Sequence, residues 1–556
     1  MSYRRSVSAR SASTSAALLV LVVGAVACSD TPAEEAPSQD GASPADQAGS
    51  AAELLLANEP WFGVMLPPGF EPHALHVISD RPAAPAVVPQ GEGQYRHLAG
   101  AAIQADLEAI VGFSRESEET AEVGEGQIWG RITGFPSGSK TIQWAVSEFR
   151  AAGISDVELQ EFDQNEGASI WLPLSWEVRL LGDPAFGAGS ADVVLESAMP
   201  LSAGDLSGGS LTAPLVYVGT ATPAELARID VQGKVAIQKA IPQGHTVFVR
   251  SPVGPRAQDL LDRGAVAVLT ILDLPGNMRA RDIGCGGGTC FNIGGRDGRF
   301  IESVLDAAAA TGTVDDIRVE MRLESQRFSG LSAENGVAII PGTSRSDEYV
   351  VLNAHADAWF DGAGDNGDGL AVLIALARHF ATPGMQQERS IVFVASAGHH
   401  SSGLSGPGNF VAMNPEIAEN AVLVVNLEHT AQRHITPARS LHEDGYREWT
   451  MDSHEAPIVA GITNLAPFLE GLVERGIQRY GTNFVSGPNT MASGEGGTYR
   501  RLGVPVFTTM QGPPMYHTTG EVLEMVSTPG LERMARFMAF FVEEVSGAPV
   551  GEINPR

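Results

Sequence analysis

The chain has 556 residues, of which 43% are hydrophobic and 18% are charged, and its formal net charge is -30. This length and composition predict a globular protein of two or three domains, because the chain is too long for one ordinary core. The negative charge argues against nucleic acids and anionic membrane surfaces as partners, because both would be repelled.

The N-terminus predicts an export signal over residues 1–27. Arginines precede an apolar run over residues 16–27, and this run is too short to span a bilayer. Cys28 follows and allows two interpretations: a small-residue cleavage site, or a bacterial lipobox whose cysteine is acylated. We favour the lipobox, although Ala25 stands where a lipobox usually has Leu. The expected protein is an exported outer-membrane lipoprotein that touches the membrane only through its lipid anchor; otherwise it is periplasmic or secreted.

Residues 28–55 predict a disordered tether, because they are small, acidic and contain prolines but little that can be buried. An amphipathic pattern predicts a helix over residues 95–117, and a second helix followed by a strand is expected within residues 130–162. Residues 56–198 thus hold the N-terminal part of an α/β domain that still lacks the centre of its sheet.

Residues 199–326 have a separate rhythm of short strands and helices, which predicts a small inserted domain. PLVYVG and GKVAIQKAI indicate strands. Through GKVAIQKA, DRGAVAVL and GGRDGRFI the segment resembles the β-rich protease-associated domain, and this resemblance implies a role in substrate access rather than catalysis. Cys285 and Cys290 are expected to form a short disulfide loop in an oxidising compartment, with two free thiols as the alternative.

Residues 327–556 are expected to supply the centre of the sheet. Five apolar runs indicate strands, and helices alternate with them: GVAIIPGT, YVVLNAHAD, RSIVFVASAG, AVLVVNLEH and VPVFTTM. The predicted fold class is therefore α/β, with three layers: a mixed, mostly parallel sheet and helices on both of its faces.

The stretch YVVLNAHADAWFDGAGDNGDG, residues 349–369, gives the first indication of a chemistry. His355 and Asp357 follow an apolar strand, at the edge where open α/β sheets bind ligands, and Asp365 lies in the next Gly-rich turn. Imidazole and carboxylate suit zinc, so His355 and Asp365 are candidate ligands, and Asp357 is placed to orient His355. The alternative is a loop of solvated polar residues.

Residues of metal-binding types also follow other predicted strands. His399 and His400 come after VFVASAG, Glu428 comes after VVNL, and His517 follows the MQGPPMY loop. Because separate segments bring such residues to one sheet edge, they predict a metal site; the alternative is a polar rim of satisfied histidines. Other histidines in this half are expected to be mostly surface or loop residues: His429, His434, His442 and His454.

In chain order, NAHADAW, GAGDNGDGLAVLIALAR, RSIVFVASAG, VVNLEH and YHTTGE resemble the motifs of metallopeptidase family 28, the co-catalytic zinc exopeptidases, over about residues 95–546. The resemblance implies that metal ions polarise the scissile carbonyl group and anchor the free amine of a peptide substrate. It implies one or two zinc ions and these roles: His355 and Glu428 as ligands of one ion, His517 as a ligand of the other, Asp365 as the bridge, and Asp357 behind His355.

The chain departs from the family pattern at Gly398-His399-His400, where the family has two adjacent glutamates, the general base and a zinc ligand. His400 can replace the glutamate that binds zinc in the family, because imidazole is also a zinc ligand. Fewer carboxylates then offset the charge of two zinc ions, so a site with one zinc ion is an alternative. His399 is the candidate general base, and the alternatives are Glu495 or no base at all. Glu428, where the family more often has Asp, is a mild departure.

Three functions remain open on this basis. The first is an exported zinc exopeptidase, most simply an aminopeptidase. The second is a catalytically silent member of the same fold that acts as a surface receptor or peptide-binding protein, and the loss of both glutamates favours it. The third is a single-zinc acyl-transfer enzyme related to the glutaminyl cyclases, which share the fold.

Overall fold

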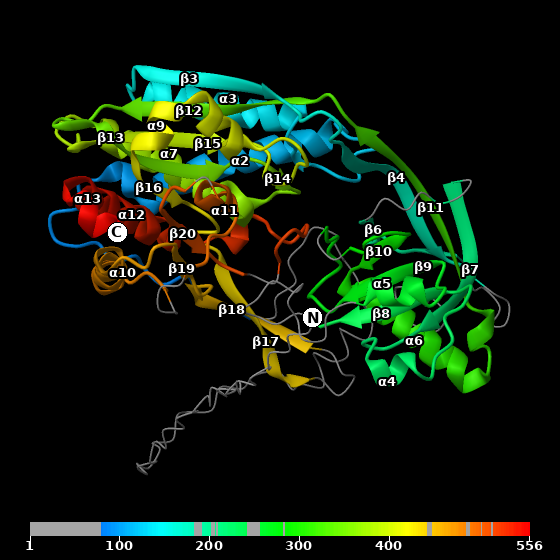
Figure 1. The fold of residues 1–556 in the computed structure, drawn as a ribbon. Helices are drawn as coiled ribbons and strands as arrows, with labels where there is room; N and C mark the ends of the chain where they lie inside the picture. The colour runs from blue at the N-terminus through cyan, green and yellow to red at the C-terminus, as the bar shows by residue number, and fades with distance from the viewer. Residues whose placement is uncertain are drawn as a thin grey trace, which may run out of the picture. The chain divides into compact units, whose positions relative to one another are not determined.

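Runs of Val, Ile and Leu form the strands of a central sheet, because strands buried on both faces must be apolar on both. In the computed structural model the strands follow the order β19-β20-β16-β13-β15-β12-β3 (Figure 1). The neighbours β20, β16, β13 and β15 run parallel, and the remaining pairs are antiparallel. The bounds are β3 (Asp156–Asp163), β12 (Ser332–Ile340), β13 (Arg345–His355), β15 (Arg389–Ser396), β16 (Ala421–Asn426), β19 (Val459–Ile462) and β20 (Val506–Met510).

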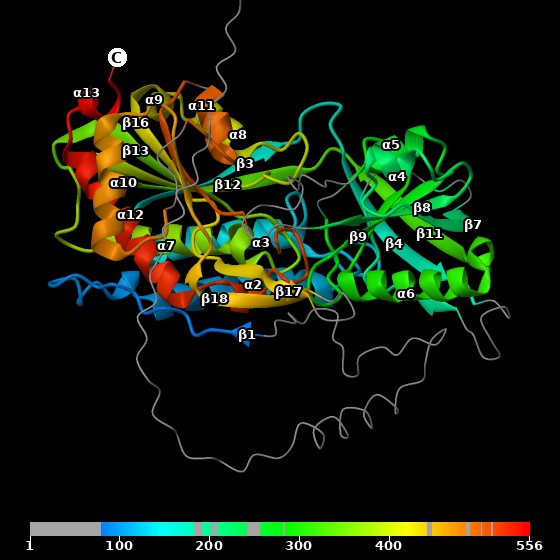
Figure 2. The ribbon, with the colours of Figure 1, turned by 90° about the horizontal axis from the view of Figure 1, so that it is seen from below.

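Helices cover both faces of this sheet, as the second view also shows (Figure 2). Val350 and Leu352 of β13 join the core on one face with Leu373, whereas Val351 points to the other face and shares a core with Tyr499. The first face carries α2 (Gly100–Glu119), α3 (Pro136–Ala151), α7 (Asp368–Ala381), α10 (Pro467–Tyr480), α12 (Thr528–Gly547) and α13 (Val550–Ile553). The second carries α8 (Gly406–Met413), α9 (Pro415–Asn420) and α11 (Glu495–Arg501). The predicted α/β class is confirmed.

A second sheet is built from residues that lie between β3 and β12 in the sequence. Its order is β5-β4-β11-β7-β8-β9-β10-β6, with α6 (Gly295–Thr311) packed on one core and α4 (Pro223–Leu226) and α5 (Ala257–Asp262) on another. The long strand β4 (Ile170–Leu180) precedes residue 199, where the sequence predicted the insert to begin. The other bounds are β5 (Val193–Val194), β6 (Met199–Pro200), β7 (Ser210–Tyr217), β8 (Val235–Ala240), β9 (Ala267–Leu272), β10 (Cys290–Ile293) and β11 (Arg318–Phe328).

Smaller elements complete the described chain. A disulfide joins Cys285 to Cys290, with their Cα atoms 6.3 Å apart. The strands β1 (Ser79–Asp80), β18 (Arg447–Glu455) and β17 (Arg433–Leu441) form a separate sheet, and β2 (Gly130–Arg131) pairs with β14 (Ala358–Trp359). Short turns of helix are η1 (Arg96–Leu98), η5 (Val314–Asp316), η6 (Ala363–Gly367) and η7 (Leu523–Met525).

The structure describes residues 79–555, except 183–191, 202–205, 207–208, 242–255, 282–283, 442–446, 485–489, 502 and 513–514. The predicted export signal, the tether and Cys28 lie outside the described residues, as does His442. Within the described part, no helix combines the length and the apolar character that a membrane span requires.

Candidate metal centre

Polar side chains gather where the parallel strands of the central sheet end. His355 is the last residue of β13, His399 and His400 follow β15, and Glu428 follows β16. Because these strands run in the same direction, their carboxyl ends lie at one edge of the sheet. The topology therefore brings together residues that are far apart in the sequence.

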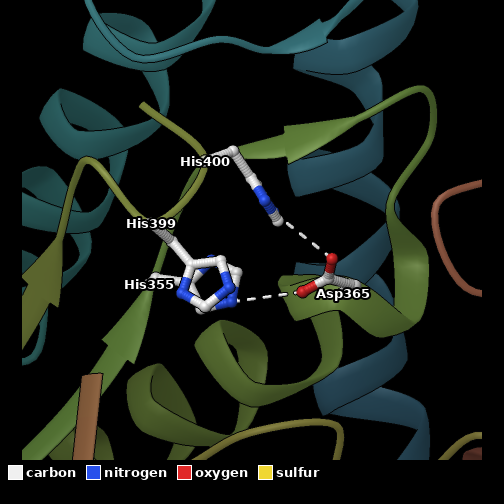
Figure 3. Close-up of side chains that lie close together, drawn as sticks. All are labelled: His355, Asp365, His399 and His400. Carbon is white, nitrogen blue, oxygen red and sulfur yellow. Dashed lines mark ion pairs between the residues drawn. The ribbon is translucent and has the colours of Figure 1, made fainter. Parts of the chain in front are cut away.

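Asp365, in the turn before α7, lies at the centre of one half of the site. Its Oδ1 is 3.2 Å from Nε2 of His355 and 3.0 Å from Nε2 of His429. Its Oδ2 is 3.3 Å from Nε2 of His400 and 2.7 Å from Nε2 of His517. Figure 3 shows the Asp365 carboxylate pointing toward His355 and His400. We call Asp365, His400, His429 and His517 the aspartate side.

Unsatisfied atoms on the aspartate side fit a cation. His355 Nε2, His400 Nε2 and Asp365 Oδ2 are buried, and their close contacts with one another and with His517 do not have the geometry of hydrogen bonds. Buried polar atoms without partners are costly, so a native structure rarely leaves several of them side by side. Imidazole nitrogen and carboxylate oxygen are zinc ligand types, so divalent ions would satisfy these atoms.

Two glutamates define the other half of the site. His399 Nδ1 lies 2.6 Å from Oε1 of Glu495, the first residue of α11. The His399 ring stacks on the His355 ring, with the ring centres 4.0 Å apart. Together with Glu428, these side chains offer ligand atoms that all lie within 4.8 Å of one another. We call Glu428, Glu495 and His399 the glutamate side; His355 lies between the two sides.

The charges around His399 bear on its candidacy as a base. Burial lowers the pKa of His399, but the adjacent Glu495 carboxylate outweighs this effect and raises the pKa to about 9. Burial raises the pKa of Glu428, and the neighbouring Glu495 carboxylate raises it further. Without a cation, His399 is therefore protonated at neutral pH; a nearby dication would favour its neutral form, which is the form that accepts a proton.

Asp357 connects the strand ends. Its carboxylate accepts hydrogen bonds from the backbone N–H groups of His399, at 3.2 Å, and His400, at 2.9 Å. Its backbone oxygen lies 3.0 Å from His355 Nδ1, and its Oδ1 lies 3.6 Å from the same atom. Asp357 thus contacts the His355 ring mainly through its main chain, while its side chain positions the two histidines after β15.

Arg131 holds the segment that joins His355 to Asp365. Its guanidinium group, which has no solvent exposure, donates to the backbone oxygens of Ala356, Asp361 and Gly362 and to the hydroxyl oxygen of Ser114. A planar guanidinium group can bind several acceptors at fixed angles. Sequence motifs gave no sign of this role, because Arg131 lies more than two hundred residues before the loop it binds.

His429 lies in the loop after β16, one of the two positions expected for it. It is not at the surface, because its side chain has no solvent exposure, and its Nε2 lies 3.0 Å from Asp365. Burial lowers the pKa of His429, but its bond to Asp365 outweighs this effect and raises the pKa to about 10. The only available signal was its position directly after Glu428 at a strand end.

The known proteins that this chain resembles are peptidases. Residues 335–542 match the model of Peptidase family M28. Aminopeptidase NAALADL1 from Mus musculus is 31% identical over 121 residues, which are 21% of this chain and 16% of the relative. Probable glutamate carboxypeptidase LAMP1 from Arabidopsis thaliana is 32% identical over 99 residues, 17% of this chain and 14% of the relative. The matches thus span about one sixth of the length of these curated relatives.

Solved structures extend the likeness to most of the chain. The Peptidase M28 precursor from Shewanella amazonensis SB2B is 18% identical, with a TM-score of 0.54, and the match covers 82% of this chain and 98% of that one. The zinc aminopeptidase BSAP from Bacillus subtilis is 17% identical, with a TM-score of 0.53, over 83% and 98%. The fold and the site define an α/β protein that carries side chains of metal-ligand types at one edge of its central sheet. Residues 335–542 carry the likeness to peptidase family M28.

Proposed function

We propose that this chain is a zinc-dependent exopeptidase, and specifically an aminopeptidase, that removes N-terminal residues from peptides. One observation carries the proposal: three imidazoles from three separate segments, His355, His400 and His517, point at the single buried carboxylate of Asp365. The names of the similar proteins, an aminopeptidase and a zinc aminopeptidase among them, support the same reaction class.

A zinc ion held at Asp365 would supply Lewis-acid polarisation of the scissile carbonyl group. His399 would accept a proton from the attacking water and return it to the leaving amine, as a general base and then a general acid. The Glu495 carboxylate, 2.6 Å from His399 Nδ1, would fix the tautomer so that Nε2 is the accepting atom. Asp357 would keep His399 in place through its backbone bond.

The test is hydrolysis of a panel of aminoacyl and dipeptide substrates by the full chain after zinc loading. We expect release of the N-terminal residue that a chelator abolishes and that added zinc restores. No turnover across the panel would contradict the proposal.

A catalytically silent binding protein is the second candidate, and the histidines at 399 and 400 favour it, since the family has two glutamates there. The double variant His399→Glu/His400→Glu separates the two candidates. Hydrolysis that appears only in the double variant would identify the native chain as silent. Hydrolysis by the native chain that His399→Ala removes would exclude silence.

The acyl-transfer alternative requires a single zinc ion, so elemental analysis of the loaded chain bears on it. Two equivalents of zinc per chain would exclude a single-zinc site.

We also propose a localisation for the protein: residues 1–27 and Cys28 support export and a lipid anchor. Mass spectrometry of the mature N-terminus would show whether Cys28 is acylated.

A further inference from the structure

Two buried carboxylates approach each other on the glutamate side. Glu428 is 2% exposed and Glu495 is 4% exposed. Each offers an oxygen within 4.8 Å of the other, with nitrogen atoms of His355 and His399 in the same group. Two carboxylates in a dry interior repel each other strongly unless a positive charge lies between them. Among the described residues, the ion-pair partners of these glutamates are imidazoles, His399 at Glu495 and His355 and His429 at Glu428, and no lysine or arginine joins them.

The local sequence makes this approach possible. Gly494 has φ +52°, a left-handed conformation, and a Cβ atom there would meet Oε2 of Glu428 at 1.9 Å. A residue with a side chain at 494 would push Glu428 away from the main chain before α11. The absence of a side chain at Gly494 therefore allows Glu495 to come beside Glu428.

The two oxygens of Glu495 have different surroundings. Oε1 bonds to His399 Nδ1, whereas Oε2 is buried and makes no hydrogen bond. For comparison, Oε2 of Glu428 accepts a hydrogen bond of 2.9 Å from Asn426. A buried carboxylate oxygen that lacks a donor needs either a proton or a cation. The neighbouring Glu428 oxygen and the His355 nitrogen are ligand types for the same cation.

We propose that Glu495 is a metal ligand of this chain: its Oε2 binds, together with His355 and Glu428, the zinc ion of the glutamate side. The inference rests on the proposed function, because it concerns the same metal centre. It explains how the chain tolerates histidines at 399 and 400. Two divalent ions carry four positive charges; Asp365 and Glu428 offset two of them, and Glu495 offsets a third.

Glu495 thereby takes two tasks that the histidine pair alone cannot perform. Through Oε2 it neutralises the metal centre, and through Oε1 it orients His399. The missing acidic group comes from α11, nearly one hundred residues after β15, rather than from the strand end itself.

Zinc titration of the metal-free full chain by isothermal calorimetry tests the proposal. Glu495→Gln keeps the shape of the side chain but removes its charge. We expect this variant to bind zinc about 10- to 100-fold more weakly, or to lose one equivalent of zinc, measured without any substrate. Glu302→Gln is the matched control: this carboxylate bonds to Tyr217 and Lys239 in the second sheet and should leave zinc binding unchanged.

A third variant separates ligation from positioning. If Glu495 acted on zinc only by holding His399, His399→Gln would weaken zinc binding as much as Glu495→Gln does; we expect a clearly smaller effect. Should Glu495→Gln fail to fold, Glu495→Asp keeps the charge but withdraws it by one carbon, and it should also weaken binding. Wild-type affinity and stoichiometry in a folded Glu495 variant would overturn this inference alone. Absence of zinc binding by the native chain would overturn the proposed function with it.

Discussion

The two halves of the candidate metal centre offer a cation opposite proportions of carboxylates and imidazoles. On the aspartate side, one carboxylate is contacted by His400, His429 and His517, and by His355 from between the halves. On the glutamate side, Glu428 and Glu495 approach one another beside His399. The difference teaches that the acidic groups of a metal centre need not follow one another in the sequence. What matters is how much negative charge the folded site buries near the ions.

The largest expected effect comes from removing the only carboxylate of the aspartate side. Asp365→Asn leaves four imidazoles around a neutral amide, so the carboxylate that contacts all four rings no longer offsets the charge of a bound cation. We expect hydrolysis to fall below detection and zinc affinity to fall at least about a hundredfold, beyond the usual cost of losing an outer partner of a ligand. Elemental analysis and the peptide assay measure both.

Asp347→Asn is the matched control for this substitution, because Asp347 is an exposed aspartate of β13 and lies outside the metal centre. It should retain native zinc content. Full zinc content in Asp365→Asn would show that the aspartate side is not a metal site.

A smaller effect is expected from His399 on the glutamate side. His399→Ala removes the proposed base but none of the proposed ligands, so hydrolysis should fall about 100- to 10,000-fold while the zinc equivalents stay the same. His434→Ala, at a half-buried histidine beside Asp452, serves as the control and should keep native activity. Native activity in His399→Ala would assign the base to another residue, with Glu495 next in line.

The smallest of the three effects concerns His429. Its Nε2 contacts Asp365, and its Nδ1 lies 3.0 Å from the backbone oxygen of Gln511, so the ring is held between a ligand and the main chain. We expect His429→Gln to weaken zinc binding about tenfold, at the low end of what an outer partner contributes. A loss as large as that of Asp365→Asn would instead make His429 a ligand in its own right.

Much of the centre could be predicted from strand ends. His355, His400 and Glu428 follow apolar runs that form β13, β15 and β16, and the parallel pairing of these strands brings their ends together. Asp365 and His517 lie in loops, and the sequence motifs around them identified both as candidates. The structure places Asp365 against three of these candidates, whereas Glu428 lies 3.9 Å from His355, at the edge of contact.

The sequence by itself determined the α/β class and the set of candidate ligands, because burial dictates apolar strands and strand direction dictates which ends meet. Only the tertiary structure decided the inward position of His429 and the approach of Glu495 to Glu428. Both depend on contacts between distant segments: His429 and Asp365 are 64 residues apart, and Glu495 and His399 are 96 apart. No local pattern encodes such contacts, because they arise only when separate loops pack over the same edge of the sheet.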